Sequence, residues 1–292
     1  MAGTLRKRSF FGYAFVLPAL VILVTFVYFP AFYSLYLSFT DYNVLVPTYH
    51  FVGLSNYVSL FHDPIFLRSL MNTAEYTAGV VPTQTLIALG LALLYGSENR
   101  VIKVLRGLVF IPAITSSVIV SLIFTWIFSP YGLVNSVLSL FGVKPQNWLL
   151  NPYAALPAIM SVAIWGTSAY FMVVFIAGLN SIPGTLYEAA AIDGAKSAWK
   201  RFRYVTLPLL KPSLYVVIVL GLIGALQIFD LSYVMTNGGP GYSTYTALLY
   251  IYNYAFSYNR MGYASAASFI LFAIIFILTL VMRRYLEVRR WS

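Results

Sequence analysis

The 292-residue sequence contains no cysteine, two histidines and few charged side chains. The absence of cysteine excludes a disulfide framework, a thiol nucleophile and a cysteine-ligated metal. His50 and His62 fall in one predicted external loop, and two such residues do not make a histidine-rich metal site. Charged residues are 9% of the chain, against roughly 25% in an ordinary soluble domain. With 60% hydrophobic residues and a mean hydropathy of +0.82, the composition predicts a membrane protein without a metal site.

Sequence motifs for nucleotide binding and for catalysis are also missing. No GxxxxGK[ST] sequence occurs, so the chain cannot hold phosphates in the manner of a P-loop. We find no paired base and nucleophile and no cluster of metal ligands, which argues against an intramembrane enzyme. Any energy from ATP must therefore come from another chain.

Six apolar runs are each long enough for a membrane-spanning helix, which needs roughly 20 residues. The first run follows Arg6-Lys7-Arg8 and exceeds the roughly 7–15 apolar residues of a signal peptide, so we interpret it as an uncleaved span. Tilt or a bend near Pro30 would absorb its excess length. The sequence predicts an all-α integral membrane protein with one transmembrane domain, residues 1–292. The six predicted spans are residues 10–39, 70–95, 107–128, 154–179, 214–236 and 264–282.

The net charge of +10 is unevenly distributed along the chain. Segments 1–10, 96–106, 180–211 and 283–292 hold 15 of the 18 Lys and Arg residues. Because basic residues accumulate in cytoplasmic loops, both termini and the loop at 183–212 are predicted to face the cytoplasm. These charges also meet anionic lipid, so no nucleic acid is needed to explain them.

The loop at 183–212 combines helix-cap signals with a dense set of charges. Thr185 and Glu188 have the spacing of a capping box, which predicts a helix start at Thr185. Gly194 is predicted to end this helix, since glycine adopts the left-handed C′ conformation at little steric cost. A second short helix is predicted over residues 197–204, so the loop should be a helix, a turn and a helix.

At these residues the sequence resembles a known family. The segments Glu188-Ala189-Ala190, Asp193-Gly194-Ala195 and Leu207-Pro208, together with Phe202, resemble the EAA loop of permease subunits in ATP-binding-cassette (ABC) importers. The form YEAAAIDGA, with TLPLLKP after it, is similar to the carbohydrate-uptake branch and to its maltose-permease-like first subunit. The likeness covers nearly the whole chain and includes FVLPAL, SLYLSFTDY, FVGLSNY, GLNSIP and FDLSYVMTNGGP.

The resemblance implies a type I ABC importer permease fold in the plasma membrane of a prokaryote. It implies a second permease subunit, two ATPase subunits that bind the ATP, and an external substrate-binding protein, with no cofactor in this chain. Glu188, Ala189, Ala190, Asp193 and Gly194 match the motif that couples the permease to the ATPase. The plainer interpretation is that Glu188 only caps its helix and Gly194 only ends it. The two are compatible, since a lever needs a fixed shape.

Polar residues inside spans are the candidates for the substrate path, because burying them in lipid is costly. Gly224, Gln227, Asp230 and Tyr233 recur at intervals of three, which predicts one face of the fifth span. A carboxylate and an amide can bond sugar hydroxyls, and small residues leave room beside them. Helix packing, or a position of Asp230 near the outer interface, is the alternative.

The third and fourth spans offer further candidates. Ser121 belongs to a row of hydroxyls, whose members more often bond their own helix than a ligand. Trp165 and Tyr170 could offer a sugar a stacking ring and a hydroxyl, although aromatic packing is the commoner role. Tyr170 also resembles a family ligand position, ahead of GLNSIP. The hydroxyl row is Ser117, Ser121, Thr125 and Ser129.

These observations predict a transport subunit, not an enzyme, that imports a sugar or oligosaccharide. Glycerol 3-phosphate or another polyol is the alternative cargo, although few cations in the spans disfavour a strongly anionic one. A rival of another class is an ion-coupled carrier that works without an ATPase. Such a carrier should show several buried carboxylates, and the spans offer only Glu75 and Asp230.

Overall fold

The computed structural model describes residues 15–96 and 99–286, whose backbone is largely helical. Across these ranges the β structure is one isolated bridge, between Thr40 and Phe51. They form two compact units, one ending at Asp63 and resuming at 251–271, the other covering 64–250 and the residues from 272 on. Residues 6–8, the start of the first apolar run and both chain ends lie outside the described residues. The single domain over 1–292 stays a prediction.

The first unit holds one long helical stretch near the start of the chain, and the start of α15. Within that stretch a π-helical turn, η1, directly precedes Pro30 at the start of α2. Proline has no backbone N–H and its ring crowds the preceding turn, which favours such a widened turn. Its elements are Phe15–Leu37, including η1 (Val24–Tyr28) and α2 (Phe29–Leu37), then α3 (Ser55–His62), η4 (Asn253–Ser257) and the start of α15 (Met261–Leu286).

Two of the family-like segments contact each other in this unit. The side-chain amide of Asn56, in FVGLSNY, donates to the backbone oxygens of Ser38 at 2.9 Å and Thr40 at 2.8 Å, in SLYLSFTDY. Nearby, the His50 backbone N–H donates to Asp41 Oδ1 at 2.6 Å. This bond holds the pKa of the Asp41 carboxyl below its ordinary value. The chain between α2 and α3 is therefore a structured loop.

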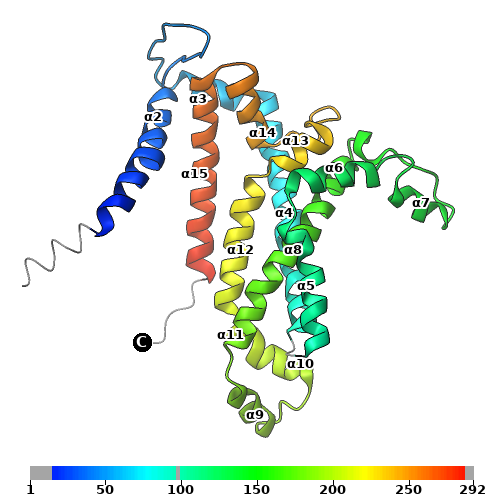
Figure 1. Cartoon of the computed structure of the whole chain (residues 1–292). Coiled ribbons are helices and arrows are strands. Elements are labelled where there is room, and N and C mark those ends of the chain that lie inside the picture. The colour runs from blue at the N-terminus through cyan, green and yellow to red at the C-terminus, as the bar shows by residue number, and fades with distance from the viewer. Residues whose placement is uncertain (1–14, 97–98, 287–292) are drawn as a thin grey trace, which may run out of the picture. The chain divides into compact units, whose positions relative to one another are not determined.

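The second unit contains the remaining helices, and Figure 1 labels the main ones. Helices α4, α8 and α12 pack against one another, α5 packs on α8, and α13 packs on α6. Its elements are α4 (Pro64–Tyr95), α5 (Arg100–Ile114), α6 (Ser117–Ile127), α7 (Leu133–Ser139), η2 (Trp148–Leu150), α8 (Ala155–Asn180), α9 (Gly184–Ile192), α10 (Ala198–Arg201), η3 (Phe202–Thr206), α11 (Leu207–Leu209), α12 (Lys211–Leu226), α13 (Asp230–Thr236) and most of α14 (Ala247–Tyr252).

Four helices of the described chain are long and apolar enough to cross a membrane. Two further helix pairs pass the same test together but are sharply bent, α5 with α6 by 94° and the α10–α11 stretch with α12 by 65°. Four helices can therefore span the membrane, or six if each bent pair crosses once. The four are Phe15–Leu37, Pro64–Tyr95, Ala155–Asn180 and Met261–Arg284.

The fifth predicted span is not one continuous helix. Helix α12 ends at Leu226, and the chain becomes helical again only at Asp230. The prediction that Gly224, Gln227, Asp230 and Tyr233 share one face of a single helix is therefore wrong. Hydrogen bonds to side chains replace those of the helix at the break, and they allow the backbone to change direction there.

Hydrogen bonds with the following segment hold this break. The Thr246 hydroxyl donates to the backbone oxygen of Ile228 at 3.0 Å, and the Ser232 hydroxyl donates to that of Thr244 at 2.5 Å. A non-helical carbonyl at membrane depth is tolerated only when such a partner satisfies it. The break after α12 is therefore a built feature of the fold.

We expect Asn72→Leu to destabilise the second unit. Asn72 on α4 is fully buried, and its Nδ2 donates to the backbone oxygens of Tyr242 at 2.7 Å and Tyr245 at 3.0 Å. Leucine has a similar volume but leaves one buried and one part-buried carbonyl unpaired, at about 1–3 kcal/mol for the buried one. Thermal unfolding of the purified protein in detergent should show a midpoint lowered by about 4 °C or more. Thr77→Val is the control, because the Thr77 hydroxyl bonds Thr73 O of its own helix at 2.7 Å. Equal shifts of the thermal midpoint in both variants would show that the Asn72 hydrogen bonds do not stabilise the unit.

Candidate functional site

The loop between α8 and α12 begins with helix α9, which starts earlier than predicted. Pro183 is the N-cap of α9 and makes no side-chain capping bond. Thr185 therefore lies within the first turn, and the predicted capping box between Thr185 and Glu188 does not form. The helical residues begin at Gly184, directly after Pro183, whose φ of −60° suits the entry to a helix. Glu188 does not act as a cap, and its carboxylate is exposed.

The end of α9 matches the prediction. Gly194 has φ +90°, the left-handed conformation, and follows the C-cap Asp193. The Gly194 N–H donates to Ala191 O at 3.3 Å and the Ala195 N–H donates to Ala190 O at 2.8 Å. These two bonds make a Schellman motif, which fixes the direction of the chain as it leaves the helix.

The second half of the loop is also helical and is tied to the first. The Ser197 hydroxyl caps α10 by accepting from the Lys200 N–H at 3.2 Å. The helix continues as η3 to Thr206, beyond the predicted end at residue 204. The hydroxyls of Tyr187 on α9 and Thr206 share a hydrogen bond of 3.0 Å. The loop is therefore a helix, a glycine turn and a helix joined at their base.

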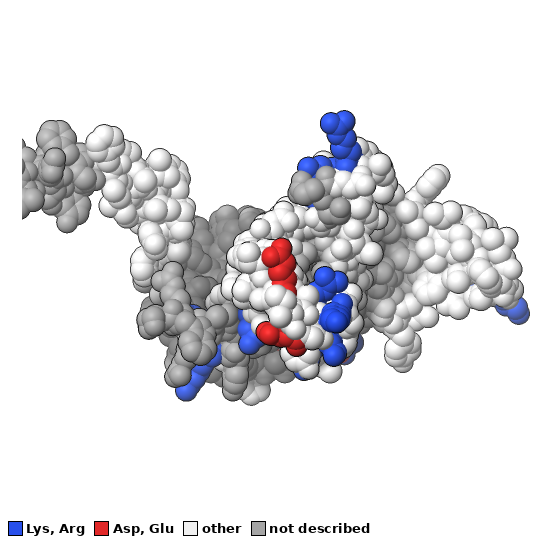
Figure 2. All heavy atoms as spheres, turned by 90° about the horizontal axis from the view of Figure 1, so that it is seen from below, with Lys and Arg blue, Asp and Glu red and all other residues white. Residues whose placement is uncertain are grey.

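The loop projects from one end of the second unit. In Figure 1, α9 lies at the end of the bundle opposite α13. Glu188 and Asp193 are exposed, as are Lys196 and Lys200 of the following segment. Seen from below in Figure 2, two acidic side chains lie close together with basic side chains beside them. Both signs of charge are thus available to a partner.

A cavity of about 400 Å³ opens between α4, α8, the α5–α6 bend and the α12–α13 break. Its volume falls within the roughly 300–1,000 Å³ of typical ligand pockets. Apolar and aromatic side chains dominate the wall, and a few polar groups converge on it. Lining residues include Tyr76, Thr115, Ser117, Trp165, Thr167, Tyr170, Gly224, Gln227, Ile228, Phe229 and Asp230.

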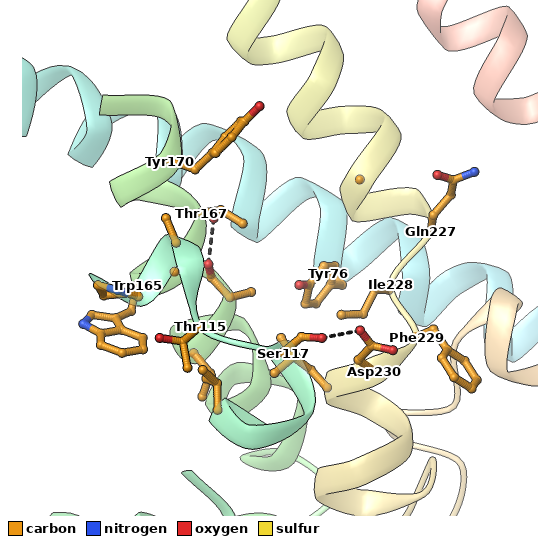
Figure 3. Close-up of a pocket in the computed structure, with 18 of the residues that line it drawn as sticks. Tyr76, Thr115, Ser117, Trp165, Thr167, Tyr170, Gln227, Ile228, Phe229 and Asp230 are labelled. Atoms are coloured by element: carbon orange, nitrogen blue, oxygen red, sulfur yellow. Dashed lines mark hydrogen bonds between the residues drawn. The ribbon is translucent and has the colours of Figure 1, made fainter. Parts of the chain in front are cut away.

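Asp230 is the charged residue of this wall. It is the first residue of α13, where the helix dipole favours a negative charge. The Ser117 hydroxyl, at the start of α6, donates a short hydrogen bond to Asp230 Oδ2. Figure 3 shows this pair facing Tyr76 and Ile228 in the cavity. Two breaks in predicted spans, at the start of α6 and of α13, thus bring a hydroxyl and a carboxylate together.

Four other predicted path residues line the same cavity, although not equally. Gly224 leaves open space, with nothing within 4 Å of where a Cβ would stand. The amide of Gln227 points away from the Ser117–Asp230 pair in Figure 3. Trp165 packs on Phe124, with ring centroids 5.3 Å apart, as well as lining the cavity. Tyr170 is half exposed.

Ser121 is placed elsewhere. It is fully buried, and its hydroxyl donates to the backbone oxygen of Ser117 at 2.6 Å. Thr125 bonds Ser121 O in the same way at 2.8 Å. Ser121 and Thr125 therefore bond their own helix, and Ser121 is not among the residues that line the cavity.

Sequence reasoning missed Tyr76 and Thr115, which line the cavity from α4 and from the α5–α6 bend. A tyrosine in an apolar span carries little signal, because aromatic packing is common there. Thr115 stands three residues after Pro112, and proline within a span could have suggested a bend. Within the described ranges, no group of three or more His, Asp or Glu could hold a metal ion.

Comparison with known proteins matches residues 84–291 to the family described as binding-protein-dependent transport system inner membrane component. The trehalose/maltose transport system permease MalF of Thermococcus litoralis is 36% identical over 98% of this chain and 95% of its own. The lactose transport system permease LacF of Rhizobium radiobacter is 35% identical over 92% of this chain and 91% of its own.

Solved structures agree with these sequence relatives. A chain of a bacterial alginate ABC transporter, in complex with an alginate pentasaccharide-bound periplasmic protein, has a TM-score of 0.84 and 25% identity. The match covers 97% of both chains. The relatives are membrane transport components of sugar ABC transporters and not enzymes. The chain therefore belongs to the binding-protein-dependent transport system inner membrane component family, as a permease of the sugar ABC transporter type.

Proposed function

We propose that this chain is the transmembrane permease subunit of an ATP-driven importer for a sugar or short oligosaccharide. It would pair with a second permease, receive cargo from an external binding protein and be driven by two ATPase subunits. The observation that supports this best is the cavity, in which one carboxylate, several hydroxyls and aromatic rings surround a volume of about 400 Å³. Hydroxyl-rich cargo needs hydrogen-bond acceptors and donors set among apolar surfaces.

In this proposal each bent helix pair crosses the membrane once, which gives six spans. Both termini and the loop with α9 then face the cytoplasm of a prokaryotic cell, as the distribution of Lys and Arg predicts. The cavity near the start of α13 lies toward the opposite side from α9 (Figure 1). Cargo would therefore enter at the α13 end and leave at the α9 end.

Coupling to the ATPases would occur through α9. Glu188, Ala189, Ala190, Asp193 and Gly194 supply its exposed acidic side chains and its fixed end. Since Glu188 caps no helix, a role in binding a partner is the interpretation that remains for its carboxylate. The bond between Tyr187 and Thr206 would pass movement of α9 to η3 and so to α12.

Uptake by reconstituted vesicles tests the proposal. The tagged chain is purified with the proteins that accompany it, reconstituted, and supplied with ATP, the external binding protein and radiolabelled maltose, trehalose, lactose or glycerol 3-phosphate. We expect a second permease and an ATPase to co-purify, and ATP-dependent uptake of at least one sugar. Uptake of glycerol 3-phosphate alone would support the polyol alternative. Uptake driven by an ion gradient, with a homo-oligomer and no ATPase, would support a carrier.

A further inference from the structure

Gln84 places an unpaired amide in the core of the second unit. It lies on α4 and is 1% exposed. Neither its Oε1 nor its Nε2 has a hydrogen-bond partner among the described residues. Buried polar groups are nearly always paired, because nothing else offsets the loss of water. The described residues therefore leave both polar atoms of this buried amide unpaired.

The position of Gln84 relates it to the cavity. Tyr76, Val80 and Gln84 are spaced by four residues, so they lie on one face of α4. Tyr76 lines the cavity. Gln84 lies eight residues further toward the α9 end, which is about 12 Å of helix. Cargo that moves inward from the cavity along this face would reach Gln84 next.

The core is apolar on both sides of Gln84 but not at its own level. One buried cluster includes Tyr76, Val80 and Ala225, and a separate one includes Ala88, Phe171 and Val217. Both clusters contain residues of α4, α8 and α12, and along α4 they lie on opposite sides of Gln84. The uncharged amide thus separates two apolar layers.

Glycine faces the amide from α12. A Cβ at Gly221 would collide with Gln84 Nε2 and stand 3.6 Å from the ring of Phe171, which also lines the cavity. From α8, the Ser168 hydroxyl donates to the backbone oxygen of Gln84 at 3.4 Å. At Gly221, α12 therefore presents no side chain to the amide. A shift of α12 away from α4 would open this level without moving a bulky side chain of α12.

We propose that Gln84 is a second sugar-binding position, inward of the cavity, which cargo occupies on its way to the cytoplasm. The proposal rests on the proposed function as a sugar importer. The amide offers a carbonyl acceptor and an N–H₂ donor, the two groups that a sugar hydroxyl needs. Both are unpaired while α12 lies against α4, and both become satisfied when cargo passes.

Gln84→Met separates this role from a structural one, because methionine has a similar length and shape but no polar atoms. Removing two unpaired polar groups from the core should raise the thermal midpoint of the purified complex by about 2–4 °C. Loss of the binding position should lower ATP-driven uptake about tenfold. Uptake is measured with whichever of labelled maltose, trehalose and lactose the wild-type complex transports fastest. A variant that is more stable but slower is the expected result.

Thr85→Val is the matched control on the next residue. Its hydroxyl is buried and bonds Val81 O of its own helix at 2.7 Å, so uptake should not change. Normal uptake by Gln84→Met would overturn the proposal and leave the amide as the site of a bound water. A thermal midpoint lowered by Gln84→Met would also overturn the proposal, because it would mean that the amide is paired in the resting protein. Gln84→Leu serves as a second variant for both the uptake and the thermal measurement. If the wild-type complex transports none of the sugars, the proposed function is wrong, and the proposal for Gln84, which depends on it, is wrong as well.

Discussion

Gly194→Pro should strongly reduce sugar uptake by the assembled transporter while the partner ATPase still hydrolyses ATP. Gly194 has φ +90°, whereas proline fixes φ near −65°. Proline also removes the N–H that donates to Ala191 O. The helix α9 would remain, but the direction in which α10 leaves it would change, and with it the link to α12. We expect the uptake rate to fall at least about tenfold, in the range of measured coupling energies between sites.

Two measurements on the same vesicles check this expectation, namely uptake of labelled sugar and release of phosphate. Gly184→Ala is the matched control, since Gly184 lies in the same loop, has no positive φ and leaves open space for a Cβ. Glu188→Lys tests the same coupling through charge, and should also leave the protein in the membrane. Normal uptake per ATP in Gly194→Pro would exclude a rigid lever, and loss of the ATPase from the complex would show a binding defect instead.

Local signals in the sequence were sufficient where one residue decides the backbone. Gly194 predicted the end of α9 because few other residues adopt its conformation cheaply. Ser197 likewise marked the start of the second helix of the loop. The capping box failed because Pro183, two residues before Thr185, already occupies the N-cap position. Pro183 and the Thr185–Glu188 pair are two competing signals for the start of α9, and the sequence alone does not decide between them.

The break between α12 and α13 could not be predicted from the span that contains it. Residues 214–236 are a continuous apolar run with helical spacing, and nothing within them requires the helix to stop at Leu226. The partner that satisfies Ile228 O is Thr246, 18 residues away. Gln84 is also a polar residue inside an apolar span, but the sequence predictions did not include it. Its lack of a partner depends on three packed helices and required the structure.

Asp230→Asn should raise the sugar concentration needed for half-maximal uptake by about 2–30-fold. A hydrogen bond to a charged group contributes about 1.5–3 kcal/mol, against about 1 kcal/mol for a neutral pair. Asparagine keeps the shape and one acceptor oxygen but loses the charge. The carboxylate is half-buried at the cavity, with Ser117 donating to Oδ2, so Oδ1 is the atom available to cargo. Uptake of labelled sugar at a series of concentrations measures the effect.

Ser117→Ala distinguishes cargo binding from a structural role of this pair. The Ser117–Asp230 hydrogen bond joins α6 to α13, and either substitution weakens it. If the pair only holds the two helices, the two variants should impair uptake and lower the thermal midpoint equally. If Asp230 binds cargo, Ser117→Ala should have the smaller effect, because it leaves the carboxylate in place and makes Oδ2 available as well. The double variant should then resemble Asp230→Asn alone, since residues in direct contact do not act additively.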